Sequence, residues 1–167
     1  MTDTIVVAEH GRLLTFGFED MNRYHGGGSP AGVATAFKVL QRAFAVLSPD
    51  RPPDRRSVMI RTAFRGPGAR DGFEAVTRAV SDARFTVDRT LVRPDLGRRR
   101  EDFVFAVGIG GTSVTMVLRD GFVSAEFIDL ARTQDRSPEQ ESHLDELKAQ
   151  LAQWLLATPA DELYDAF

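Results

Sequence analysis

The sequence lacks cysteine altogether. This absence excludes disulfide bonds, thiolate nucleophiles, cysteine-ligated zinc and iron–sulfur clusters. It assigns no compartment, because an exported protein need not carry disulfides. Lysine is scarce too: Lys38 and Lys148 are the only two, and nearly all basic residues are arginine. Arginine suits phosphate recognition, but a bias across a whole chain also follows from a high-GC coding sequence.

Long hydrophobic runs and a large net charge are also missing. The apolar run Ile5 to Ala8 follows the acidic Asp3 and is too short for a signal peptide, and no stretch approaches the length of a membrane-spanning helix. A formal net charge of −3 gives no general attraction to nucleic acid or to an anionic membrane. We therefore expect a cytoplasmic protein without nucleic-acid or membrane partners.

The composition that remains is that of an ordinary globular protein. Hydrophobic residues make up 43% of the 167 residues and charged residues 27%. This length fits one domain, which can bury a sizeable core without covalent staples. We expect a single domain over residues 1–167.

The spacing of apolar residues predicts the elements of this domain. Helical spacing and capping residues predict helices at about 18–24, 30–47, 71–82 and 138–157. Alternation predicts strands at 58–61 and 85–87, and β-branched and aromatic residues predict strands at 103–109 and 113–118. The turn signal Asp120-Gly121 suggests a further strand at 122–128, and residues 4–8 form either a short strand or an extended arm. Consecutive strands joined by tight turns favour an α+β fold, with a mixed, largely antiparallel sheet and helices packed on one face.

The main candidate site is the loop His25-Gly26-Gly27-Gly28-Ser29-Pro30. Its glycines allow the backbone to approach a ligand, and the helix that follows, with Ser29 as N-cap, presents free N–H groups that suit a phosphate, a carboxylate or an oxyanion. His25 can act there as an acid, a base or a ligand. The loop lacks the lysine of a P-loop and is not a dinucleotide motif. The alternative is a tight helix–helix connection whose glycines serve close packing.

A second glycine-rich turn, Gly66 to Gly72, can build the opposite wall of the same pocket. Arg65 and Arg70 can supply positive charge, and Asp71 can orient His25. The alternative is a plain strand-to-helix turn in which Asp71 is the N-cap. The candidate catalytic residue is therefore His25, and the candidate ligand-binding residues are Gly26, Gly27, Gly28, Ser29, Arg70 and Asp71.

The remaining polar clusters favour simpler interpretations. His10 and His143 have no metal-ligand spacing and are expected to be solvated. The run Arg98-Arg99-Arg100 can bind an anion or RNA. No aromatic residues interleave with it, which favours a solvated loop. Trp154 lies on an apolar helical stripe that belongs either to the core or to an oligomer interface.

The segment Tyr24 to Gly32 (YHGGGSPAG) resembles the His-Gly-His-x-Cys-Pro-Gly motif of the FmdE-like family of formylmethanofuran dehydrogenase subunits. Three later segments are similar to that family as well: the turn and helix of 66–80, the strand around 103–107, and the ending 158–164. The resemblance covers most of the chain at low identity. It implies that family's fold, with the motif opening a long helix after a short one.

The resemblance also implies a degenerate metal site. The family's motif binds metal through His and Cys, and of these ligands only His25 is present here. Gly27 stands at the position of the second His, Ser29 at that of the Cys, and Pro67 near that of a later Cys. Some members carry a C-terminal zinc ribbon, which this chain lacks. We expect no cofactor, and at most a residual zinc or other metal site at His25.

Three functions stay open on this basis. The first is a pocket for a small anion or carbonyl compound at the glycine-rich helix start, with His25 as the acid or base if the protein is an enzyme. The second is a non-enzymatic subunit or structural homodimer, in which the loop only packs. The third is a residual metal site that uses His25 with carboxylates or His10.

Overall fold

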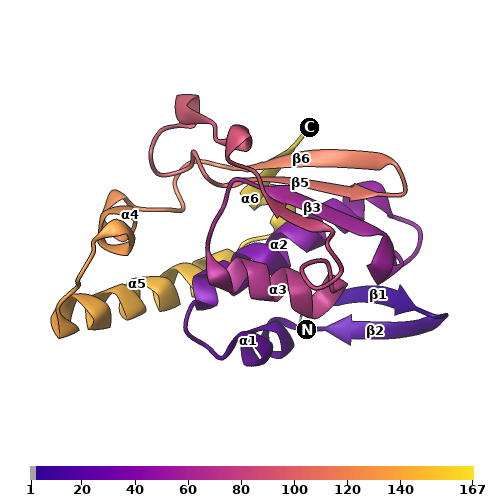
Figure 1. The fold of residues 1–167 in the computed structure, drawn as a ribbon, viewed down its shortest axis with the longest axis horizontal. Coiled ribbons are helices and arrows are strands. Elements are labelled where there is room, and N and C mark those ends of the chain that lie inside the picture. The colour runs from indigo at the N-terminus through magenta and orange to yellow at the C-terminus, as the bar shows by residue number, and fades with distance from the viewer. Residues whose placement is uncertain (1–2) are drawn as a thin grey trace.

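The computed structural model describes residues 3–167 and has an α+β fold with helices packed beneath a mixed, largely antiparallel sheet (Figure 1). Five strands form this sheet in the order β4-β3-β5-β6-β7, and a separate hairpin joins β1 and β2. This confirms the predicted fold class. In the part of the chain that the structure describes, no helix combines the length and the apolar character needed to cross a bilayer.

The sheet is built around one antiparallel hairpin. β5 (Val104–Ile109) pairs with β6 (Thr112–Leu118), and β3 (Val58–Thr62) lies antiparallel on the other side of β5. The short edge strand β4 (Phe85–Val87) runs parallel to β3, so the sheet is mixed. β3 alternates between buried and exposed residues, as expected for a strand with one face on the core.

The central helix is α2 (Pro30–Leu47), which lies between the sheet and the helices α3 (Pro67–Thr77) and α5 (Pro138–Ala157) (Figure 1). Every residue from Val33 to Leu40 is buried. A helix buried on all sides needs small side chains wherever it meets another helix closely, and α2 has alanines at 31, 34, 36 and 43. Its predicted range, 30–47, is confirmed.

The N-terminal segment forms a hairpin and a short helix beside this core. Of the two alternatives for residues 4–8, the strand is the one present, as β1 (Ile5–Glu9). It pairs with β2 (Arg12–Phe16), a strand that was not predicted. The turn between them uses a positive φ at His10 and Gly11. The predicted helix at 18–24 is α1 (Phe18–His25), and Gly26, in the left-handed conformation, ends it.

The prediction of a helix at 71–82 capped by Asp71 is wrong in both of its bounds. The helix α3 starts at Pro67, with Gly66 as N-cap, because proline is favourable at the first helical position, where its missing N–H costs nothing. It ends at Thr77, and Arg78 takes a left-handed conformation. Asp71 therefore lies inside the helix and does not cap it.

Ser29 also differs from its predicted role. It stands at the N-cap of α2, but its side chain makes no capping hydrogen bond, and its backbone φ of −141° and ψ of 68° are not those of a usual cap. In contrast, the predicted capping box of α5 is present: Gln140 N–H donates to the Ser137 hydroxyl, and Ser137 N–H donates to the Gln140 side chain.

The predicted strand at 122–128 is wrong. The second half of this segment is the first part of the helix α4 (Ala125–Arg132), which begins where the Ser124 hydroxyl accepts a hydrogen bond from Phe127 N–H at 3.0 Å. The edge position beside β6 is taken instead by β7 (Tyr164–Ala166), which follows the one-turn helix α6 (Ala160–Leu163) at the end of the chain. A local cap thus outweighs the apolar run that suggested a strand.

One core residue of α2 is charged, which leads to a stability prediction. Lys38 is 1% exposed, and its Nζ lies 3.7 Å from Oδ2 of the exposed Asp3. Burial lowers the pKa of Lys38, and Asp3 offsets this only in part. We expect Lys38→Met to raise the free energy of unfolding at neutral pH by about 1 kcal/mol, because an apolar side chain of similar length removes the desolvation cost.

The lowered pKa of Lys38 also predicts how the stability of the protein changes with pH. Because the pKa of Lys38 is lower in the folded state, the unfolded state binds more protons between that pKa and 10.5, and the stability of the parent protein rises with pH there. Lys38→Met should lose this rise in urea unfolding measured over that range. Lys148→Met, at a partly exposed site on α5, is the control and should keep it. A destabilised Lys38→Met would contradict the prediction.

Candidate functional site

His25, the predicted catalytic residue, lies at the last position of α1 and pairs with α3. Its Nδ1 is 2.8 Å from Oδ2 of Asp71, and its side chain is 9% exposed. Nε2 is buried and has no hydrogen-bond partner among residues 3–167. This nitrogen faces Gly28, since a Cβ placed on Gly28 would lie 3.9 Å from it. An acid–base role for His25 therefore requires the glycine loop to move away from Nε2.

The structure separates the other predicted site residues. Gly26 and Gly27 are exposed and have φ values of 97° and 84°, which only glycine adopts readily. Arg70 is exposed on α3, next to Asp71, which pairs with His25. Ser29 lies on a cavity that the others do not line. The predicted pairing of His25 with Asp71 is present, whereas the seven residues do not line one common pocket.

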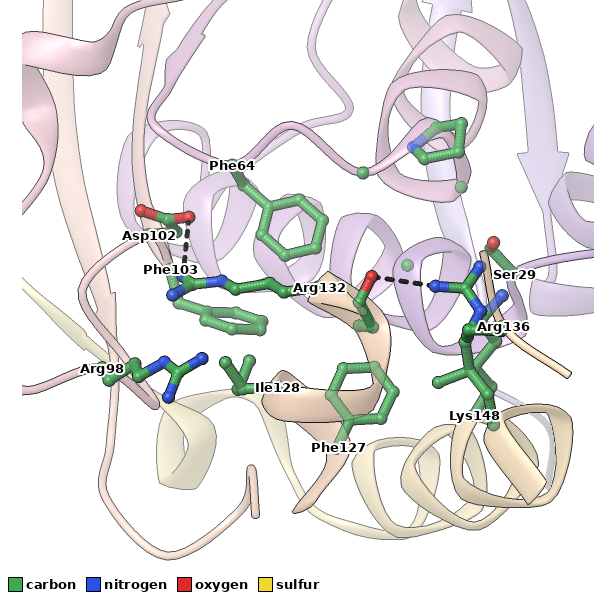
Figure 2. Close-up of a pocket in the computed structure, with 16 residues that line it drawn as sticks. Ser29, Phe64, Arg98, Asp102, Phe103, Phe127, Ile128, Arg132, Arg136 and Lys148 are labelled. Atoms are coloured by element: carbon green, nitrogen blue, oxygen red, sulfur yellow. Dashed lines mark hydrogen bonds and ion pairs between the residues drawn. The ribbon is translucent and has the colours of Figure 1, made fainter. Parts of the chain in front are cut away.

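The cavity next to Ser29 has a volume of about 390 Å³ and lies between the starts of α2 and α3, the loop before β5, α4 and α5 (Figure 2). We call it the α2–α3 cavity. Its apolar wall consists of Phe64, Phe103, Phe127, Ile128 and Leu144. Its polar side chains are Ser29, Arg98, Asp102, Arg132, Arg136 and Lys148. The volume lies toward the lower end of the range of ~300–1,000 Å³ typical of small-molecule sites.

The starts of α2 and α3 touch each other at this cavity. A Cβ on Gly32 would lie 2.9 Å from Ala69 N, and a Cβ on Gly68 would lie 2.9 Å from the Ser29 Cβ and clash with the Ser29 carbonyl oxygen. Only glycine at both positions allows this approach. Gly32 and Gly68 both line the cavity, so the contact brings the N-terminal ends of two helices to one wall.

Both helix starts keep unpaired N–H groups. Each has proline as its first residue, and neither has a side-chain cap. Within residues 3–167, the N–H groups of Ala31, Gly32, Gly68 and Ala69 donate no hydrogen bond. Two positive helix ends thus coincide, and such ends favour an anion.

The cations of the cavity fall into two groups, which Figure 2 shows at opposite ends. Arg98 and Arg132 lie at one end and have carboxylate partners: Arg98 pairs with Asp129 at 2.7 Å, and Arg132 lies 3.6 Å from both Glu101 and Asp102. Their positive charge is therefore compensated by neighbouring acids.

Arg136 and Lys148 lie at the other end, next to Ser29 (Figure 2). Arg136 caps the end of α4: its Nη1 donates to the carbonyls of Leu130, Ala131 and Thr133, and its Nε donates to Glu141 at 2.9 Å. Lys148 Nζ donates to the Gly28 carbonyl at 3.3 Å, and no carboxylate lies within 4.0 Å of it in residues 3–167. Because Arg136 pairs with Glu141, Lys148 is the cation of this end that has no carboxylate partner in the described residues.

Sequence reasoning missed most of the lining of this cavity. It interpreted Arg98 as part of a solvated loop and assigned no role to Lys148 or to α4. The lining segments lie between residues 29 and 148, and only tertiary packing brings them together. The signal that could have singled out Lys148 is its rarity, as one of two lysines in an arginine-rich chain.

Comparison with known proteins adds no assignment. No protein-family model matches the sequence, and no curated protein matches it significantly. Among residues 3–167, no three His, Cys, Asp or Glu side chains lie close enough together to hold a metal ion.

Proposed function

We propose that this protein binds a small anionic molecule in the α2–α3 cavity. The observation that supports this most strongly is the meeting of two uncapped helix starts with Lys148 at one end of a partly open, largely apolar cavity. Helix ends and an ammonium group attract the same kind of ligand, and apolar walls strengthen that attraction by excluding water. The glycines at 32 and 68 let the two helix starts lie against each other at the wall of the cavity.

The predicted pocket is retained in this proposal, but its position changes. The pocket lies on the Ser29 side of the glycine-rich loop. His25 and Asp71 do not line it, but their hydrogen bond connects α1 to α3. Binding is the function we propose, and a reaction is not part of it, because the buried Nε2 of His25 does not line the cavity. A cytoplasmic location belongs to the same proposal.

The kinship with the FmdE-like family also remains a proposal, based on the segment Tyr24 to Gly32. The family's metal does not fit the residues present. Of the motif's ligand positions, only His25 keeps a donor nitrogen, the Nε2 that has no hydrogen-bond partner in the described residues. Gly27 offers no donor side chain, and the Ser29 hydroxyl is a poor replacement for a thiolate. We propose that the loop has kept the family's helix start and lost its metal.

A second candidate is a non-enzymatic subunit that forms a homodimer. The close contact of Gly32 with the α3 start favours it, because packing alone accounts for these glycines. Trp154 is 50% exposed and lies 5.0 Å from Phe122 between ring centroids, which leaves an aromatic pair at the surface of α5. In this case the cavity has no ligand and the protein acts through association.

The test is a titration of ¹⁵N-labelled protein with a panel of small carboxylates and inorganic phosphate, followed by amide chemical shifts. We expect saturable shifts at the amides of Gly32 and Gly68. Ala131→Trp, which adds bulk beside the cavity, should weaken binding at least about tenfold. Ala125→Trp, at an exposed position of the same helix away from the cavity, is the matched control and should bind normally.

Two results would contradict the proposal. One is the absence of saturable shifts at Gly32 and Gly68 with every anion, and the other is equal binding by the two tryptophan variants. A dimeric mass in light scattering together with either result would favour the second candidate.

A further inference from the structure

The two ends of the α2–α3 cavity differ in net charge, and this difference defines the orientation of a ligand. At the Arg98 and Arg132 end, the acids Glu101, Asp102 and Asp129 balance the guanidinium groups. At the Ser29 end, Arg136 pairs with Glu141, but the ammonium group of Lys148 and the two helix starts lack such partners within residues 3–167. A second anionic group at the first end would have to break existing ion pairs. The ligand is therefore expected to carry its negative charge at one end only.

The space between the two ends is lined by aromatic and aliphatic side chains. Phe64 and Phe103 lie on one side, with ring centroids 4.8 Å apart, and Phe127 and Ile128 of α4 lie opposite (Figure 2). Flat rings packed against aromatic faces gain more than their buried area alone supplies. The wall therefore suits a ring better than a flexible polar chain.

Size narrows the ligand class further. A volume of about 390 Å³ accommodates a molecule with one or two rings and leaves no room for a dinucleotide. Polyphosphates are also disfavoured, because their several charges would extend into the apolar middle of the cavity.

We infer that the ligand is a small aromatic monoanion, of the aryl carboxylate class, whose carboxylate lies at Lys148 and the starts of α2 and α3 and whose ring lies between Phe64, Phe103 and Phe127. This inference rests on the proposed function and adds the ligand class and its orientation. Lys148 is the residue that selects charge, and the phenylalanines select the ring.

Four probes in matched pairs test the two halves of this inference. Benzoate carries both the ring and the charge, benzamide keeps the ring without the charge, and acetate and inorganic phosphate keep charge without the ring. We expect benzoate to bind at least about tenfold more tightly than each of the other three, as measured by the shifts of the Gly32 and Gly68 amides. The benzoate ring should show nuclear Overhauser contacts with Phe64 and Phe127.

Lys148→Met tests the orientation. It should weaken benzoate about tenfold and leave benzamide unchanged, since only the carboxylate loses a partner. The variant should fold normally, because methionine favours helices and the lost hydrogen bond to Gly28 is exposed. Gln150→Met, at an exposed position of α5 outside the cavity, is the control and should bind benzoate like the parent protein.

The outcomes separate this inference from the proposed function. Tighter binding of acetate or phosphate than of benzoate, at the same amides, would overturn the aromatic class and leave anion binding intact. Equal binding of benzoate and benzamide would overturn the role of the charge. No shift at Gly32 and Gly68 with any probe would overturn both the inference and the proposed function.

Discussion

Gly68→Ala should destabilise the protein by about 2 kcal/mol, even though alanine is the better helix former. An added Cβ would overlap the Ser29 carbonyl oxygen and lie 2.9 Å from the Ser29 Cβ and 3.2 Å from the Gly32 Cα. These neighbours are mainly backbone, so relief requires α3 to move away from α2. Overpacking of this kind costs about 1–3 kcal/mol, whereas helix propensity alone would stabilise the variant by up to ~1 kcal/mol. A lower free energy of unfolding for Gly68→Ala would therefore indicate that the starts of α2 and α3 are in close contact.

Urea unfolding followed by circular dichroism measures this change. Gly108→Ala in β5 is a suitable control, because its added Cβ would meet neighbours only at 3.6 Å and beyond. We expect less than about 0.5 kcal/mol for the control. A stabilised Gly68→Ala variant would show that the starts of α2 and α3 do not touch as the structure has them. Because both Gly32 and Gly68 line the α2–α3 cavity, the destabilised variant should also bind benzoate more weakly.

The parts of the fold that could be predicted are those that local chemistry defines. Proline at the first position fixed the start of α2 at residue 30, and the Ser137 and Gln140 capping box fixed the start of α5. The β5–β6 hairpin was predicted from β-branched and aromatic residues on both sides of a tight turn. In each case the signal lies within a few residues of the boundary.

The errors arose where local signals were ambiguous. Asp71 is a good cap by residue type, but Pro67 four residues earlier is a better helix start, and Asp71 instead binds His25 on another helix. The segment 122–128 is short and apolar, a pattern that strands and buried helices share. The N-cap Ser124 favours the helix α4 in this segment, and the C-terminal β7 occupies the edge of the sheet beside β6.

The candidate site was predicted only in part, for a physical reason. The sequence identifies a glycine-rich helix start, and the structure confirms that start and the pairing of Asp71 with His25. The position of the cavity relative to the loop depends on Phe64, Phe103 and α4. No local sequence pattern relates these distant segments. The ion pairs that neutralise Arg98 and Arg132 are likewise long-range contacts.

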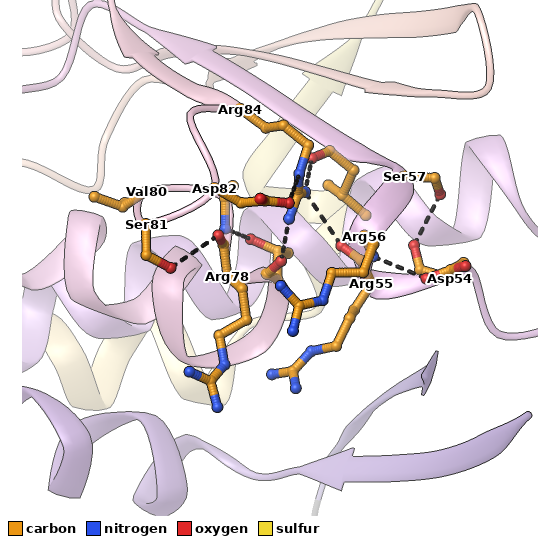
Figure 3. A network of polar contacts seen from close by, with 12 residues as sticks. Asp54, Arg55, Arg56, Ser57, Arg78, Val80, Ser81, Asp82 and Arg84 are labelled. Atoms are coloured by element: carbon orange, nitrogen blue, oxygen red, sulfur yellow. Dashed lines mark hydrogen bonds and ion pairs between the residues drawn. The ribbon is translucent and has the colours of Figure 1, made fainter. Parts of the chain in front are cut away.

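Arg55→Met should destabilise the protein more than any other single change considered, by about 3 kcal/mol. Arg55 is 5% exposed and closes the end of α3: its Nε donates to the Val76 carbonyl at 2.9 Å and its Nη2 to the Ala75 carbonyl at 2.8 Å. Its own carbonyl belongs to the polar network of Figure 3, where it accepts a hydrogen bond from Arg84 Nη1 at 3.3 Å. Its Nη1 lies 3.7 Å from Glu9 on β1, so it also connects α3 to the N-terminal hairpin. Methionine would leave these carbonyls and Glu9 without their buried partner, and such losses cost about 3–5 kcal/mol when the group is fully enclosed.

Arg56→Met is the matched control for this change. Arg56 is the next residue, it donates to the same Glu9 at 2.9 Å, and its side chain is 45% exposed. Both variants remove one positive charge near Glu9, but only Arg55→Met removes hydrogen bonds to the end of α3. Because exposed ion pairs contribute little, we expect Arg56→Met to cost less than about 1 kcal/mol. Urea unfolding compares the two, and hydrogen exchange at the amides around Arg78 should accelerate only in Arg55→Met. Equal costs would mean that the buried hydrogen bonds of Arg55 add nothing to its contact with Glu9, and that α3 is held by its apolar face alone.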